Sequence, residues 1–282
     1  RLVLDFALAA LRAEQLGKHD ATDYLAVGFC STDYIGHDYG PNSHEIREQF
    51  ARLDRTLNDL ITALEQQVGK DQFVVALSAD HGVLQLPEYL AQEQNFASRR
   101  INPRKIIDPA IAKLDSSLQE EFDIAEDLIE SRAFLNYRAA AAKGVDSLWL
   151  ERLVRDGLLQ IDGIADVYFR REISGNVVPQ QPYLEQFRRN YYSPREGDFL
   201  LRYCENCLVS TRRKGTSHGT PYRYDTHVPV IFWGMNLKPQ RVGRAIHTID
   251  VAPTLAAILG IRYPRSVEGE VLKEITSTER RK

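Results

Sequence analysis

The sequence predicts an α/β fold with a mostly parallel central sheet and an inserted α+β subdomain. Three near-continuous apolar runs, at residues 24–29, 73–78 and 228–233, have the length and composition of strands buried on both faces of a parallel sheet. A long amphipathic segment lies between the first two runs, so that strand, helix and strand form a βαβ unit. The middle of the chain lacks this alternation, and we assign it to the insertion.

Composition and charge limit the class of protein. A chain of 282 residues is long enough for one large α/β domain or two smaller ones. Its net charge of −3 gives no reason to expect a nucleic-acid duplex or an anionic membrane as a partner. No apolar run in the sequence approaches the roughly 20 residues that span a bilayer.

The chain begins with a predicted amphipathic helix at residues 1–18, RLVLDFALAALRAEQLGK. This stretch lacks the small-residue cleavage site of a signal peptide. The first residue is Arg1, and the only methionine is Met235. We therefore expect the natural N-terminus, with any targeting signal, to lie outside this chain.

The strongest helix prediction covers residues 43–68. Asn42 is the predicted N-cap, with Glu45 three residues later as in a capping box, and Gly69 is predicted to end the helix. A single apolar stripe runs along the segment, formed by Ile46, Phe50, Leu53, Leu57, Leu60, Ile61, Leu64 and Val68.

Polar motifs follow the first two predicted strands. The stretch STDYIGHDYGP follows residues 24–29, and ADHG begins just after residues 73–78. Ligands of parallel α/β sheets bind beyond the carboxyl ends of the strands. The candidate metal ligands at these two strand ends are Asp33, His37, Asp80 and His81.

Asp33 and His37 stand four residues apart, a spacing that suits one face of a helix. Their neighbours Gly36, Gly40 and Pro41 instead favour a loop. We interpret the stretch as a sharp turn beyond the strand that brings both side chains to one ion, which makes the helical spacing incidental. The alternative is a polar loop with an incidental histidine.

The remaining chain divides into an insertion and a second part of the core. The predicted domains are residues 1–94 and 201–282 for the α/β core and residues 95–200 for the insertion, which combines helical stretches with a β-like piece at residues 165–173. Near the end, residues 247–261 predict a helix in which Asp250 is a candidate cap, Pro253 lies in the first turn and Gly260 ends the helix.

The cysteines are Cys30, Cys204 and Cys207. The last two have C-x-x-C spacing, which alone is weak evidence for zinc because a zinc ribbon needs a second pair. The pair also does not open a helix after a strand, as a redox motif does. A hairpin disulfide or two free thiols are the favoured alternatives, and a disulfide would fit an oxidising compartment.

His218, in GTSHG just before the third apolar run, extends the set of candidate ligands. Three histidines and two carboxylates provide the nitrogen and oxygen donors that zinc accepts. Two zinc ions a few ångströms apart can polarise a phosphoryl group and stabilise both the attacking and the leaving oxygen. Five ligands are too few for two four-coordinate ions, so further ligands must come from elsewhere.

The motifs STDYIGHDYGP, LSADHGV and GTSHGTPYRYDTHVPVIFWG, in this order, resemble the alkaline phosphatase superfamily. The likeness is greatest to PafA-type bacterial alkaline phosphatases, relatives of the type I phosphodiesterase/nucleotide pyrophosphatase family. The resemblance implies an α/β/α sandwich with two Zn²⁺ ions. One ion would be held by Asp33, His37 and His218, and the other in part by Asp80 and His81. Family members complete the second site with an Asp and a nucleophilic Thr or Ser, which we expect to lie outside this chain.

The implied activity is hydrolysis of small-molecule phosphate monoesters through a phospho-Thr or phospho-Ser intermediate. This fragment alone is expected to be inactive because the nucleophile is missing. The alternatives are a phosphodiesterase with the same metals, which the form YDTHVP disfavours, and a non-catalytic metal-binding fragment or degenerate relative. The resemblance also implies a periplasmic or secreted location, whereas the oligomeric state is not indicated.

Two further groups of residues carry open interpretations. His227 is either a donor that supports a metal ligand or a core histidine that orients Asp225. Arg212, Arg213 and Lys214 either attract phosphate or form the solvated tip of a hairpin.

Overall fold

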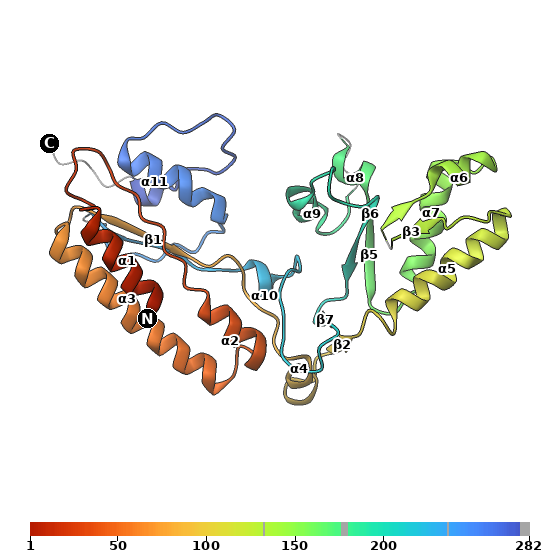
Figure 1. Ribbon diagram of the computed structural model, residues 1–282, viewed down its shortest axis with the longest axis horizontal. Helices are drawn as coiled ribbons and strands as arrows, with labels where there is room; N and C mark the ends of the chain where they lie inside the picture. Colours follow the sequence, from red (N-terminus) through yellow and green to blue (C-terminus); the bar gives the residue numbers. More distant parts are fainter. Residues whose placement is uncertain (132, 176–179, 236, 277–282) are drawn as a thin grey trace. The chain divides into compact units, whose positions relative to one another are not determined.

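The computed structural model describes residues 1–131, 133–175, 180–235 and 237–276. These form two compact units (Figure 1). The first unit combines Arg1–Gly82 with His227–Lys282, and the second is Val83–Thr226. The predicted insertion at residues 95–200 lies within the second unit, and its borders stay a prediction.

The N-terminal part of the first unit is a pair of packed helices, α1 (Leu2–Ala13) and α3 (His44–Gln67), which lie side by side in Figure 1. Helix α1 buries one face, formed by Leu4, Ala7 and Leu11 at three- and four-residue intervals. At the far end of α3, the side-chain amide of Gln67 donates hydrogen bonds to the carbonyls of Leu11 (2.5 Å) and Leu16 (3.1 Å).

The N-cap of α3 is Ser43 and not Asn42, so this prediction was wrong by one residue. Ser43 has an extended backbone, and its Oγ accepts a hydrogen bond from the amide of Ile46 at 3.2 Å. Both residue types are good caps, and the decision depends on which of them precedes the first helical turn. Gly69 follows the helix with a φ of +110°.

The first unit holds a two-stranded sheet, β1 (Val74–Ser78) and β8 (Val230–Gly234), which pair antiparallel with Val74 opposite Gly234. A Cβ atom at Gly234, whose φ is +107°, would lie 2.3 Å from the carbonyl oxygen of Phe73, so glycine is required there. At the other end, Ser78 Oγ donates to the carbonyl of Pro229 at 3.0 Å. This register places the chain that leaves β1 beside the chain that enters β8.

Two details of the predicted sheet are wrong within the described residues. Residues 24–29 form no strand, and β1 and β8 are antiparallel where a mostly parallel sheet was expected. The strands are also incompletely covered, since Ile231 is 54% exposed and Trp233 is 37% exposed. Apolar runs indicate that a segment is to be buried, but they do not specify the partner strand or its direction.

The C-terminal part of the first unit contains a 3₁₀ turn, η1 (Thr248–Asp250), and the helices α11 (Val251–Leu259) and α12 (Lys273–Thr276). The Asp250 carboxylate accepts hydrogen bonds from the amides of His247 and Glu270, each at 2.8 Å. Gly260 ends α11 in the left-handed region, as predicted. Arg244 forms a bidentate ion pair with Glu274 of α12. Its Nε lies 2.5 Å from Glu274 Oε1, and its Nη2 lies 3.0 Å from Oε2.

The second unit combines short helices with small sheets. Helix α7 (Ser147–Leu159) is capped by Asp146 and packs on β5 (Ile164–Phe169), which pairs antiparallel with β6 (Phe199–Tyr203). Strand β2 (Arg99–Ile101) pairs parallel with β7 (Cys207–Val209), and β3 (Ile129–Glu130) pairs with β4 (Phe134–Leu135). The other helices are α4 (Pro87–Glu93), α5 (Ile107–Phe122), α6 (Tyr137–Ala142), α8 (Arg170–Ser174), α9 (Leu184–Asn190) and α10 (Arg223–Thr226).

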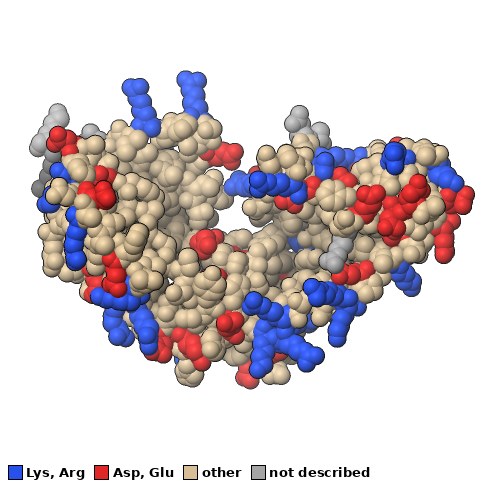
Figure 2. All heavy atoms as spheres, in the orientation of Figure 1, with Lys and Arg blue, Asp and Glu red and all other residues tan. Residues whose placement is uncertain are grey.

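The surface carries both signs of charge. Lys and Arg side chains are interspersed with Asp and Glu over both units on the face that Figure 2 shows, as the net charge of −3 predicts. Among the described residues, every helix is too short or too polar to cross a membrane.

Candidate metal centre

Helix α2 (Ser31–Tyr39) carries the first pair of predicted ligands. Asp33 and His37 are one turn apart on this helix, with Asp33 Oδ1 3.4 Å from His37 Nε2. The interpretation of this stretch as a sharp loop was wrong, because the four-residue spacing is a true helical spacing. Gly36 is buried within the helix, and the turn comes only at Gly40, which has a φ of +82°.

His81 joins this pair from the chain that leaves β1. Its Nε2 lies 3.8 Å from Asp33 Oδ1 and 3.6 Å from Asp80 Oδ2. Its Nδ1 lies 2.8 Å from the carbonyl oxygen of Gly82, which can only accept a hydrogen bond. In a neutral ring the proton is therefore on Nδ1, and Nε2 presents its lone pair to the carboxylates. Distances of 3.4–3.8 Å between pairs of donor atoms thus link four of the five predicted ligands within the first unit.

Two carboxylate–imidazole pairs have the spacing of two ligands on one zinc ion. Bonds of 2.0–2.2 Å in a tetrahedral site place neighbouring ligand atoms about 3.3–3.6 Å apart. The pairs Asp33–His37 at 3.4 Å and Asp80–His81 at 3.6 Å fall in this range, whereas the 3.8 Å between Asp33 and His81 exceeds it. All three separations exceed a direct hydrogen bond. The side chains of His37 and His81 are each 24% exposed and that of Asp80 is 88% exposed, so the cluster is open to solvent.

His218 belongs to the second unit, where it lies in the loop that leads into α10. The loop turns at Gly219, which has a φ of +106°. Thr220 then donates two hydrogen bonds to Asp225 Oδ2, from its amide at 2.8 Å and from its hydroxyl at 2.7 Å. Burial raises the pKa of the Asp225 carboxyl group, while the hydrogen bonds from Thr220 and the nearby His218 oppose this rise.

Asp225 is the residue at this site that the sequence did not single out. From the sequence, Asp225 was considered only as a partner of His227. His227 is exposed, and the first unit resumes at this residue. The available signal was the spacing of Thr220 and Asp225 directly after the His-Gly pair. A hydroxyl and a carboxylate five residues apart can cross-link a tight loop.

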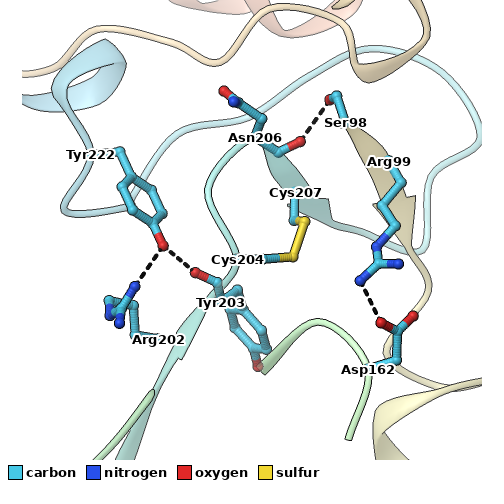
Figure 3. Close-up of a disulfide and its surroundings, with 9 residues drawn as sticks. All are labelled: Ser98, Arg99, Asp162, Arg202, Tyr203, Cys204, Asn206, Cys207 and Tyr222. Carbon is cyan, nitrogen blue, oxygen red and sulfur yellow. Dashed lines mark hydrogen bonds and ion pairs between the residues drawn. A yellow bond between two sulfur atoms is a disulfide. The ribbon is translucent and has the colours of Figure 1, made fainter. Parts of the chain in front are cut away.

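Cys204 and Cys207 form a disulfide (Figure 3), which confirms the expected bond but not the expected hairpin, because β6 pairs with β5 and β7 with β2. It joins the end of β6 to the start of β7. On one side of it, the hydroxyl of Tyr222 donates to the carbonyl of Tyr203 at 2.5 Å, and on the other Ser98 Oγ donates to the carbonyl of Asn206 at 2.7 Å. The basic run Arg212, Arg213 and Lys214 is exposed, as expected for a solvated segment.

A family model described as type I phosphodiesterase / nucleotide pyrophosphatase matches residues 2–146, just over half of the chain. This chain belongs to that family. The matched residues include the Asp33, His37, Asp80 and His81 cluster. The family resemblance expected from the motifs is thereby confirmed.

Individual relatives match almost the whole length of this chain. It is 36% identical to a protein named calcium-transporting ATPase from Myroides odoratus, over 97% of this chain and 50% of that protein. It is 29% identical to the alkaline phosphatase PafA of Elizabethkingia meningoseptica, over 97% and 50%. The crystal structure of wild-type PafA matches with a TM-score of 0.82 at 28% identity, over 98% of this chain and 52% of that one.

These likenesses confirm the α/β, alkaline-phosphatase-like fold class. They also show that the chain spans about half the length of the curated relatives it matches.

Proposed function

We propose that this member of the type I phosphodiesterase / nucleotide pyrophosphatase family provides metal ligands to a two-zinc hydrolase of phosphate monoesters. One observation carries the proposal: each of the two proposed ions is offered a carboxylate paired with an imidazole, Asp33 Oδ1 at 3.4 Å from His37 Nε2 and Asp80 Oδ2 at 3.6 Å from His81 Nε2. The similarity to an alkaline phosphatase over nearly the whole chain supports the choice of monoesters.

In this proposal Asp33, His37 and His218 hold one zinc ion, and Asp80 and His81 help to hold the other. Bound zinc would polarise the phosphoryl oxygens and stabilise the charge on the entering and leaving oxygens. The two carboxylates reduce the net charge of the centre, and the neutral imidazoles leave the metal electrophilic. The carbonyl of Gly82 orients His81 so that Nε2 is its ligand atom.

The nucleophile of the proposed reaction is a Thr or Ser outside these 282 residues, which would carry the phosphoryl group between two displacements. The chain alone is therefore expected to bind metal without turnover. The expected substrate is a small phosphate ester that reaches an open cluster of ligands.

We place the protein in the periplasm or outside the cell. The Cys204–Cys207 disulfide supports this location, because disulfides persist in oxidising compartments.

A phosphodiesterase with the same metal ligands is the second candidate, because the matching family model is described by that activity. Monoesterase and diesterase sites differ in the groups around the non-bridging oxygens of the phosphate. The two candidates therefore differ in substrate preference while sharing the ligands proposed here.

The test is a comparison of turnover on p-nitrophenyl phosphate and bis-p-nitrophenyl phosphate. The zinc-loaded protein is expressed with its native flanking sequence. A large preference for the monoester supports the proposal, and a preference for the diester replaces it with the second candidate. Zinc binding without turnover of either compound indicates a non-catalytic metal-binding protein.

A matched pair of variants tests the metal assignment itself. His37→Ala is expected to lower both zinc content and activity. His19→Ala is the control, because His19 also pairs with an aspartate four residues away, Asp23 at 2.9 Å, on the exposed surface. Unchanged zinc content and activity in His37→Ala would show that the metal site is wrongly assigned.

A further inference from the structure

We propose that Asp225 is a positioning residue for His218: its buried carboxylate locks the loop that presents this proposed zinc ligand. The inference rests on the proposed function, since it assigns a role toward the ion that His218 would hold. It concerns only residues of the second unit.

The lock is a pair of hydrogen bonds to one oxygen atom. Asp225 Oδ2 accepts from the amide of Thr220 at 2.8 Å and from its hydroxyl at 2.7 Å. Thr220 follows His218 by two residues, with only Gly219 between them. Glycine at a φ of +106°, with no heavy atom within 4 Å of the position of its missing Cβ, leaves this turn little local restraint. The carboxylate supplies the restraint from outside the turn.

Burial makes these hydrogen bonds effective. Asp225 is 3% exposed, so its carboxylate is shielded from the solvent that competes for surface hydrogen bonds. Oδ2 accepts both donors of Thr220, and Oδ1 is buried without a hydrogen-bond partner among the described residues. The carboxylate acts on His218 through the loop that Oδ2 holds.

Helix α10, which carries Asp225, is anchored in turn. The carbonyl of Tyr222 accepts hydrogen bonds from the amides of Asp225 and Thr226, each at 3.0 Å. The Tyr222 hydroxyl accepts from Arg202 at 3.0 Å and donates to the carbonyl of Tyr203 at 2.5 Å, as Figure 3 shows. Both of these partners belong to β6, whose end is closed by the disulfide.

A metal ligand whose loop is held by hydrogen bonds to an anchored helix is preorganised for its metal. Outer partners that orient metal ligands typically contribute 10- to 100-fold to metal affinity. We therefore expect Asp225→Asn to weaken binding of the His218-dependent zinc ion about tenfold or more. Thr220→Val removes the hydroxyl bond to Asp225, and with it the weaker 3.4 Å bond that this hydroxyl accepts from the Tyr222 amide, but keeps the amide bond to Asp225. It is expected to act in the same direction by less, while Thr220→Ser retains the hydroxyl group and the affinity of the wild type.

The experiment measures Zn²⁺ affinity by competition with a chromophoric chelator, in the protein expressed with its native flanking sequence. Asp115→Asn is the matched control. Asp115 is a buried carboxylate of the same unit, 7% exposed, that accepts two backbone amides at 2.7 and 2.8 Å. A general loss of packing would affect this control and Asp225→Asn alike, whereas the proposed lock affects only the latter.

The comparison of Thr220→Val with Thr220→Ser keeps the test decisive if Asp225→Asn fails to fold. Wild-type zinc affinity in Thr220→Val and in any folded Asp225→Asn, together with lost affinity in His218→Ala, overturns the positioning role alone. Wild-type affinity in His218→Ala shows instead that the proposed metal site is wrong, and the inference fails with it.

Discussion

Removal of the Tyr222 hydroxyl group tests the hydrogen bonds that anchor helix α10 beside the loop that carries His218. Tyr222→Phe deletes one oxygen atom and leaves the shape of the ring unchanged. That oxygen accepts a hydrogen bond from Arg202 and donates one to the carbonyl of Tyr203. Tyr222 is only 2% exposed, so water cannot easily replace either partner.

The magnitude follows from the two bonds. A buried hydrogen bond between neutral groups contributes about 1 kcal/mol, and one to a charged group about 1.5–3 kcal/mol. Arg202 retains a bond to the hydroxyl of Tyr168 at 2.9 Å, which reduces the loss. We therefore expect Tyr222→Phe to lower the local free energy of unfolding by about 2–3 kcal/mol.

Hydrogen–deuterium exchange of peptides from residues 199–226 measures this loss locally, which avoids assuming that two units unfold in one step. Tyr191→Phe is the control, because the Tyr191 hydroxyl is buried without a hydrogen-bond partner among the described residues. Its removal is expected to be neutral or slightly stabilising. Equal exchange in the two variants would contradict the anchoring role of Tyr222.

Three further predictions concern the first unit. Ser43→Ala is expected to cost about 1 kcal/mol as the loss of the α3 cap, and more than Asn42→Ala, by urea denaturation. Gly234→Ala is expected to destabilise the protein strongly because of the 2.3 Å contact, whereas Gly243→Ala has open space, and thermal unfolding compares them. The ion pair of α12 lowers the Glu274 pKa from 4.5 to about 2, so its contribution is present above pH 4.5 and is lost as the pH falls towards 2. Amide exchange in α12 follows this loss, and Glu274→Gln is expected to abolish its pH dependence.

Short-range sequence patterns correctly predicted the elements that depend on residues close together in the chain. Helix α3 followed from an apolar stripe of helical period, and its C-terminal end from Gly69. The single C-x-x-C pair left a disulfide as a favoured alternative because a zinc ribbon needs a second pair, and the structure shows the disulfide. Asp33, His37, Asp80 and His81 were recognised by residue type and motif order, and the structure brings them together.

The errors arose where distant contacts outweigh local preference. Gly36 and Gly40 favoured a loop, yet α2 is a helix that packs on α3, and tertiary packing overrides weak propensities. Adjacent Asn42 and Ser43 are equivalent caps by type, so the choice between them depends on how the chain enters the helix.

The amino-acid sequence alone determined which chemical groups this protein offers and the family to which it belongs. Only the tertiary structure decided that β1 pairs antiparallel with β8 and that Asp225 accepts a hydrogen bond from the amide of Thr220. Residue types and short-range periodicity are properties of a segment, whereas a strand ladder or a buried hydrogen bond needs a second partner. The position of that partner is established only when the chain has folded.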